Sequence, residues 1–219
     1  MDYYFRFGVV WANFDKLLQG LALGLTLALV AIAAGTIIGI VCAFAAAGGN
    51  RATRVGVNAY VSIIRNTPIL VIVLLVFFAL PQLGVRLDKY QSFIASLAVY
   101  AGAYLTEVFR AGLSGVPRGV IDAGRAIGMT GVQVSTYVVF PIMLRNSLPA
   151  MGTTFISLFK DTSIATAIAV PELTFQARKI NVETFRVVEV WLVASGLYVA
   201  TCLVIAAGLR QVERRYSRL

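Results

Sequence analysis

The longest charge-free stretch of the sequence lies between Lys16 and Arg51. Its centre, LALGLTLALVAIAAGTIIGIVCAFAAA, exceeds the roughly 20 apolar residues that a helix needs to cross a bilayer. Composition agrees with a membrane protein, because 59% of the 219 residues are hydrophobic and 13% are charged, against about 45–50% and 25% in soluble chains. The stretch therefore predicts a membrane-spanning helix.

Four further apolar stretches follow the first along the chain. Together the five predict an all-α integral membrane protein with a single transmembrane domain over residues 1–219. The predicted spans cover about residues 18–47, 56–81, 90–114, 143–170 and 189–210. Because five is an odd number, the two termini are expected on opposite sides of the membrane.

Basic residues are distributed unevenly over the loops. One side carries ten basic residues and only two acidic ones, Asp122 and Glu213. The basic residues are Arg51, Arg54, Arg110, Arg118, Arg125, Arg145, Arg210, Arg214, Arg215 and Arg218. The positive-inside rule predicts that this side is cytoplasmic, with the N-terminus outside and the C-terminus inside. The net charge of +9 then reflects topology and contact with anionic membrane lipid, and not nucleic acid.

The sequence offers few groups for chemistry. Cys42 and Cys202 stand alone in apolar stretches, and there is no histidine. We therefore predict no catalytic residues, no metal site and no cofactor on this chain. A G-x-x-x-x-G-K-[ST] phosphate-binding loop is also absent from the sequence, so ATP hydrolysis would require a second polypeptide.

The polar segment after the third span predicts a short helix. Arg118, Asp122 and Arg125 are spaced i, i+4, i+7 and would share one face. Pro117 can begin this helix and Gly128 can end it. Spacing alone leaves two alternatives open, which are a helix lying on the membrane surface and a helix that docks onto another protein.

The fourth span contains charges in its interior. Lys160 and Asp161 lie deep in it, where each costs about 2.5–3.5 kcal/mol unless it is compensated. A zwitterionic amino acid would supply a carboxylate for Lys160 and an ammonium for Asp161, and Thr162 and Ser163 would add hydroxyl groups. The alternatives are a structural ion pair, a charge at a helix break that holds the fold together or, for Asp161, the cap of a half-helix.

The second span contains Arg65-Asn66-Thr67-Pro68. Proline interrupts a helix, and Thr67 with Pro68 predicts the N-cap and first position of a new half-helix. A broken helix is tolerated at membrane depth where it borders a cavity. Arg65 could contact a substrate carboxylate or pair with Glu107 of the next span.

Small and aromatic residues in the spans have structural interpretations. The glycine pairs at positions 20/24 and 35/39 predict close helix contacts. Tyr100 and Tyr104 are interpreted as packing residues or interface anchors.

Several ordered motifs resemble one transporter family. Asp122-Ala123-Gly124, then Gly128, then Val138-Val139-Phe140-Pro141 resembles the "EAA" loop of ABC-importer permeases, with Asp in place of Glu and Gly in place of the second Ala. Four other segments narrow the resemblance to polar amino acid permeases, over about residues 20–210. They are Arg65-Asn66-Thr67-Pro68, Gly102-Ala103-Tyr104, Glu107 and Lys160-Asp161-Thr162-Ser163.

This resemblance implies the membrane subunit of an ATP-driven amino acid importer in the bacterial cytoplasmic (inner) membrane. Its cytoplasmic loop, about residues 115–141, would seat in a groove of the ATPase. The implied coupling residues are Arg118, Asp122, Ala123, Gly124, Gly128 and Pro141. The implied partners are a second permease subunit, identical or paralogous, two ATP-binding subunits and an extracytoplasmic amino-acid-binding protein. The implied substrate-binding residues are Arg65, Asn66, Thr67, Lys160, Asp161, Thr162 and Ser163.

The alternative class of function is an autonomous secondary transporter or channel driven by an ion gradient. Five spans without an internal repeat count against it. Between Ile142 and Phe159 there is no carboxylate to pair with a cationic side chain, which favours a neutral or acidic polar amino acid as substrate.

Overall fold

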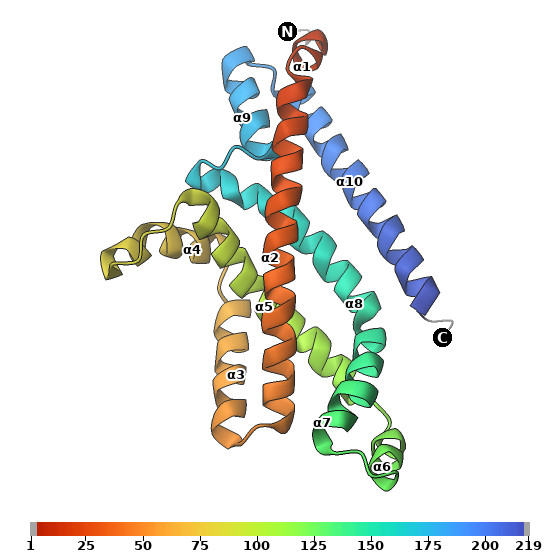
Figure 1. Ribbon diagram of the computed structural model, residues 1–219. Helices are drawn as coiled ribbons and strands as arrows, with labels where there is room; N and C mark the ends of the chain where they lie inside the picture. The colour runs from red at the N-terminus through yellow and green to blue at the C-terminus, as the bar shows by residue number, and fades with distance from the viewer. Residues whose placement is uncertain (1–3, 217–219) are drawn as a thin grey trace.

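The computed structural model describes residues 4–216, and every regular element in that range is helical (Figure 1). After the short helix α1 (Gly8–Trp11), α2 (Phe14–Gly48) runs the full height of the molecule. It crosses α5 (Lys89–Ser114), and the contact between these two helices is the most extensive in the fold. The main apolar core is built around α2 and α5, with Met143, Met151 and Leu158 packed against them.

The other elements surround this pair. α3 (Arg51–Arg65) returns beside the lower half of α2, and α4 (Ile69–Leu74) continues through two irregular turns, η1 (Leu75–Ala79) and η2 (Leu80–Leu83). The remaining elements, in chain order, are α6 (Arg118–Ala126), α7 (Gly131–Gln133), η3 (Val134–Val139), α8 (Phe140–Asp161), η4 (Thr162–Ile168), α9 (Leu173–Thr184) and α10 (Val187–Tyr216).

The second apolar stretch is broken at the predicted proline. α3 and the helix over residues 69–83 are bent by 101°, so this stretch is not one straight span. The position of the cap was predicted one residue too early, because Pro68 is itself the N-cap of α4. The Thr67 hydroxyl instead donates to the Ile63 carbonyl oxygen at 2.8 Å, within the end of α3.

Three described helices, α2, α5 and α10, are long and apolar enough to cross a membrane, and the bent pair could form a fourth span. Within residues 4–216, α8 does not meet the same criterion. It carries Arg145, Lys160 and Asp161, which lower its hydropathy. The predicted number of five spans and the orientation of the termini therefore stay predictions.

The glycine pairs of α2 allow close contacts with other elements, as predicted. A Cβ atom on Gly35 would lie 2.6 Å from the Ala101 Cβ and 3.0 Å from the Ala98 carbonyl oxygen of α5. Near the other end of α2, a Cβ on Gly20 would lie 2.8 Å from the Glu172 carbonyl carbon. Backbone atoms cannot move aside as a flexible side chain can, so these glycines set the distance between the helices.

We expect Gly35→Ala to destabilise the protein by about 1–3 kcal/mol, because overpacking against the α5 backbone forces the helices apart. Gly196→Ala in α10 is the matched control, since no heavy atom lies within 4 Å of its Cβ position. Thermal unfolding of both variants in detergent measures the difference. Equal midpoints for the two variants would contradict the predicted contact.

α10 is the least buried of the three long apolar helices. Its N-terminal part packs with α9 in a second apolar cluster that contains Leu17, Ile180, Val190 and Ala194. Farther along, Val199, Leu203 and Val204 are exposed, and α10 diverges from α2 (Figure 1), while its Leu209 lies beside Gly152 of α8. Such an apolar surface is suited to lipid or to another membrane helix.

Candidate functional site

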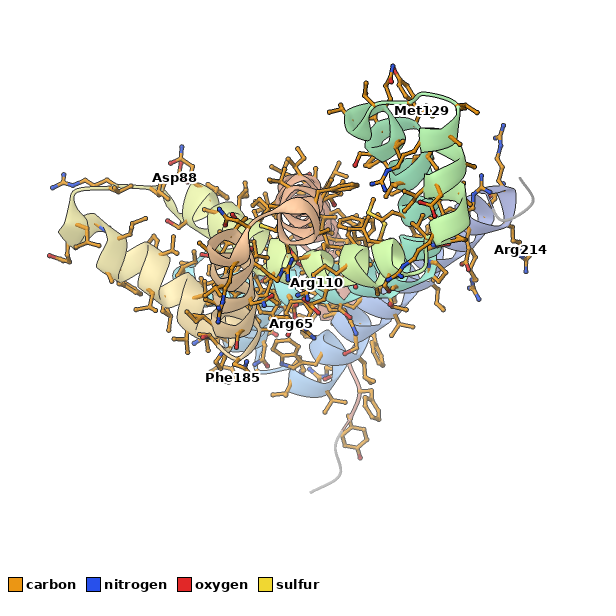
Figure 2. The ribbon with its side chains drawn as sticks, turned by 90° about the horizontal axis from the view of Figure 1, so that it is seen from below. Arg65, Asp88, Arg110, Met129, Phe185 and Arg214 are labelled. Atoms are coloured by element: carbon orange, nitrogen blue, oxygen red, sulfur yellow. The ribbon has the colours of Figure 1, made fainter. Side chains whose placement is uncertain are left out.

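A row of polar side chains follows one face of α5. Tyr100, Tyr104 and Glu107 are spaced i, i+4, i+7, and Arg110 continues the row at the next turn. α3 lies on one side of this row and α8 on the other, so the row borders two cavities. Figure 2 places Arg65 and Arg110 near the middle of the bundle, where α3 and α5 face each other.

The first cavity lies between α5 and α8 and has a volume of about 600 Å³. Its lining residues are Tyr100, Tyr104, Thr153, Thr154, Ser157, Leu158, Lys160, Asp161 and Ser163. Among the described residues, neither Lys160 nor Asp161 forms an ion pair, either with the other or with a third residue. The cavity thus holds one cation and one anion that are both open to a ligand.

Two alternatives for this segment are not supported by the geometry. Lys160 and Asp161 are not a structural ion pair, and Asp161 makes no capping hydrogen bond although it occupies the N-cap position of η4. Thr162, a predicted ligand, is buried, and its hydroxyl donates to the Phe159 carbonyl oxygen at 2.7 Å. It faces Gly24 of α2, with 3.3 Å between its Oγ1 and the position of a Cβ there, and it does not line the cavity.

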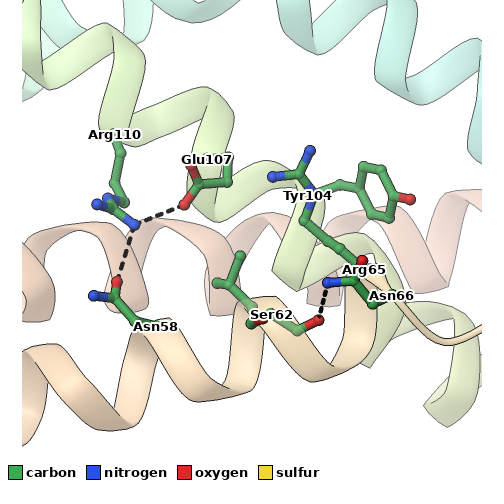
Figure 3. Close-up of a pocket in the computed structure, with 8 residues that line it drawn as sticks. Asn58, Ser62, Arg65, Asn66, Tyr104, Glu107 and Arg110 are labelled. Atoms are coloured by element: carbon green, nitrogen blue, oxygen red, sulfur yellow. Dashed lines mark hydrogen bonds and ion pairs between the residues drawn. The ribbon is translucent and has the colours of Figure 1, made fainter.

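The second cavity, of about 580 Å³, lies between α3 and α5. Its lining residues are Asn58, Val61, Ser62, Arg65, Asn66, Tyr104, Glu107 and Arg110 (Figure 3). Thr67, also a predicted ligand, lines neither cavity. Tyr104 is shared by both cavities, so the two adjoin at this ring.

The predicted pair between Arg65 and Glu107 is absent from residues 4–216. Glu107 instead pairs with Arg110 of the same helix at 2.7 Å, and Arg110 also donates to the Asn58 Oδ1 at 3.1 Å. The Arg65 guanidinium lies over the Tyr104 ring, 5.0 Å from its centre, an arrangement that a ring's negative face favours. The Arg65 guanidinium therefore has no carboxylate partner among the described residues and could bind an anion.

Tyr100 and Tyr104 were predicted to be packing residues or interface anchors, and Tyr100 does pack against the main apolar core. Both rings border the cavity with Lys160 and Asp161, and the Tyr100 hydroxyl donates to that of Tyr104 at 3.1 Å. Helical spacing could have identified them, since Tyr100, Tyr104 and Glu107 lie on one face of α5. The same spacing aligns Thr154, Ser157 and Asp161 on α8, which was also overlooked.

The polar segment after α5 folds as a helix, as predicted. α6 begins at Arg118, with Pro117 as the N-cap, and Arg118, Asp122 and Arg125 are all exposed. Figure 2 shows Met129 at the tip of the loop that follows, away from the bundle. Gly124 is buried against Val134 of η3, where a Cβ would lie 3.3 Å from the valine methyl.

Two further positions of this loop have defined structures. Gly128 has φ +89°, and the Met129 amide donates to the Gly124 carbonyl oxygen at 3.1 Å, which is the hydrogen-bond pattern of a helix that ends on a left-handed glycine. Ala123 is exposed beside Asp122, and Pro141 stands in the first turn of α8. The loop thus holds α6 against η3.

We expect Gly128→Ala to loosen the end of α6, because a left-handed backbone costs a residue with a side chain about 1–2 kcal/mol. Gly119→Ala is the matched control, because both positions have open space around them and only Gly128 has a positive φ. Hydrogen exchange of the α6 amides should rise in Gly128→Ala alone. Equal exchange in the two variants would contradict the prediction.

Comparison with known proteins shows which family the chain belongs to. Residues 35–218 match the family model described as binding-protein-dependent transport system inner membrane component. The chain belongs to this family. As an inner-membrane transport component, it has the apolar helices that such a location requires.

Two curated relatives of this transport component cover most of its length. Glutamine transport system permease protein GlnP of Escherichia coli strain K12 is 33% identical over 217 residues, 98% of this chain and 99% of the relative. L-cystine transport system permease protein TcyB of Bacillus subtilis strain 168 is 35% identical over 185 residues, 84% of this chain and 79% of the relative.

Solved structures share the fold of the transport component. One chain in the crystal structure of an amino acid ABC transporter with histidines matches with a TM-score of 0.88 and 30% identity, over 97% of this chain and 100% of that chain. A chain of the inward-facing MetNI methionine ABC transporter matches with a TM-score of 0.81 at 22% identity, over 94% and 98%. The second match concerns the fold alone.

Proposed function

We propose that this chain forms the translocation pathway for a polar amino acid in an ATP-driven importer. The observation that carries the proposal is the cavity in which neither Lys160 nor Asp161 forms a salt bridge with a residue that the structure describes. Unpaired charges at membrane depth are costly and mark a functional site by default. A zwitterionic amino acid supplies one opposite charge for each.

The substrate would be oriented by its two backbone charges. Its carboxylate would bind the Lys160 ammonium, and its ammonium would bind the Asp161 carboxylate, in charge-assisted hydrogen bonds. Ser157, Thr153 and Thr154 offer hydroxyl groups for a polar side chain. Asp161 is the only carboxylate among the described lining residues of this cavity, which favours a neutral or acidic side chain over a cationic one.

A second permease subunit is part of the proposal. Lys160 and Arg65 are exposed on the single chain, as are Leu70, Val71 and Leu75 on the helix that leaves the bundle. Exposed charges facing lipid would be unfavourable, so a second permease, identical or paralogous, would cover the cavities and complete the pathway. Such a subunit could also contribute a charge of its own to the site.

Coupling to ATP would pass through α6. Two ATP-binding subunits would hold the exposed face of Arg118, Asp122 and Arg125 in a groove, and closure of these subunits would rock the two permeases. This assigns α6 to the cytoplasm, with five spans, an N-terminus outside and a C-terminus inside. An extracytoplasmic amino-acid-binding protein would then dock on the opposite side, at the loops over residues 82–89 and 171–189.

The proposal is tested by reconstituting the permease with its ATP-binding subunits and its binding protein in proteoliposomes. Uptake of a labelled amino acid should require ATP on the side of the ATP-binding subunits. The competing function is an autonomous secondary transporter or channel. Uptake by the permease alone, driven by an ion gradient without ATP, would establish that function instead.

A further inference from the structure

The cavity with Lys160 and Asp161 is the first of three hollows that border α5 and share lining residues. Tyr104 separates it from the cavity between α3 and α5, and Arg110 at the far end of that second cavity also lines a third one, of about 380 Å³. The third cavity reaches Ser114, the last residue of α5 before α6. From Tyr104 to Ser114 the helix rises about 15 Å, so the three hollows follow one path toward the α6 end.

The second cavity has charges of its own. The Arg65 guanidinium forms no salt bridge with a carboxylate in the described part of the chain. Glu107 uses Oε1 to bind Arg110, and its other oxygen, Oε2, forms no hydrogen bond with a described residue. One cation and one carboxylate oxygen are thus available within a single hollow (Figure 3).

Stability does not account for the pair of Glu107 with Arg110. Their side chains are 36% and 39% exposed, and ion pairs this open contribute only about 0–1 kcal/mol. Both residues lie near the α6 end of α5 and line the second cavity, so their charges border this hollow. The arrangement resembles the first cavity in its chemistry, with a free cation and an acceptor for an ammonium.

We infer that the cavity between α3 and α5 is a second, exit-side binding site for the transported amino acid. This inference rests on the proposed function. The substrate carboxylate passes from Lys160 to Arg65 across the hydroxyl groups of Tyr100 and Tyr104. Its ammonium then binds Glu107, on the way to the third cavity and the α6 end. An amino acid on the α6 side reaches this site first, and its presence there slows release of the next one.

The test uses the complete transporter in proteoliposomes, with ATP inside, binding protein and labelled amino acid outside, and unlabelled amino acid at varied concentration inside. The readout is the internal concentration that halves the initial uptake rate. In Glu107→Gln we expect this concentration to rise at least tenfold. Glu213→Gln is the matched control, because Glu213 lies on α10 and lines none of these three cavities, and it should leave the value unchanged.

Two further variants separate a binding role from a structural one. The exchange Glu107→Arg with Arg110→Glu keeps an ion pair but moves the carboxylate about 4.5 Å away along the helix, so internal inhibition should stay weak. Ser62→Leu narrows the cavity without touching the pair and should also raise the half-inhibitory concentration, even if Glu107→Gln fails to assemble.

Three results would overturn the inference while leaving the proposed function intact. They are ATP-driven uptake without internal inhibition in the wild type, normal inhibition in both Glu107→Gln and Ser62→Leu, and full restoration by the exchanged pair. If the wild-type complex shows no ATP-driven uptake, the proposed function fails, and this inference fails with it.

Discussion

Replacing Lys160 by methionine should reduce ATP-driven amino acid uptake at least about 30-fold. Truncating one partner of a buried charged hydrogen bond costs about 2–5 kcal/mol, and each 1.4 kcal/mol is a factor of ten. Methionine keeps the length of the side chain, so the loss reports the charge and not the volume. The measurement is the initial uptake rate of the reconstituted complex at saturating binding protein.

The matched control for this variant is Lys16→Met. Lys16 is an exposed lysine that donates to the Asn13 Oδ1 at 2.8 Å, and it lines neither of the two large cavities. Its replacement should leave uptake within a factor of two. ATP hydrolysis and co-purification of the ATP-binding subunits should be retained in Lys160→Met. Normal uptake by this variant would remove Lys160 from the site.

Reversing the charge of Asp122 should abolish co-purification of the ATP-binding subunits. Asp122 lies between Arg118 and Arg125 on the exposed face of α6, and Asp122→Lys turns this face into three adjacent cations. Like charges brought together at an interface cost several kcal/mol, enough to separate a complex that is held by a short helix. Affinity purification from detergent-solubilised membranes, with the permease tagged, measures the retained subunits.

Two controls accompany Asp122→Lys. Asp122→Glu keeps the charge and should retain the complex, and Asp15→Lys makes the same reversal in the first turn of α2, at the opposite end of the molecule (Figure 1). All variants should insert into the membrane in similar amounts. Retention of the ATP-binding subunits by Asp122→Lys would show that this face of α6 is not the docking surface.

Local sequence patterns predicted the individual elements well. The spans over about residues 18–47 and 90–114 correspond to α2 (Phe14–Gly48) and α5 (Lys89–Ser114). The helix of the polar loop corresponds to α6, with its predicted end at Gly128. These features depend on residues close together in sequence, since apolar runs, proline and a left-handed glycine act on their own helix.

The composition of the site was predicted only in part. Lys160, Asp161 and Ser163 border one cavity, and Arg65 and Asn66 border the other. Thr162 and Thr67 line neither cavity. Each follows a cavity-lining residue in the sequence, and successive side chains on a helix point in directions about 100° apart. The position of Tyr100 and Tyr104 beside a cavity was not predicted, although their i, i+4 spacing places both on one face of α5.

Sequence patterns alone predict a helical membrane protein with a charged fourth stretch and a helix in its polar loop. Hydropathy and helical spacing carry that information within each segment. The position of Arg65 of α3 over the Tyr104 ring of α5 is known only from the three-dimensional fold. The reason is the packing between helices, where Gly35 and its neighbours bring α2 against α5, and the register of such contacts is a property of the whole fold.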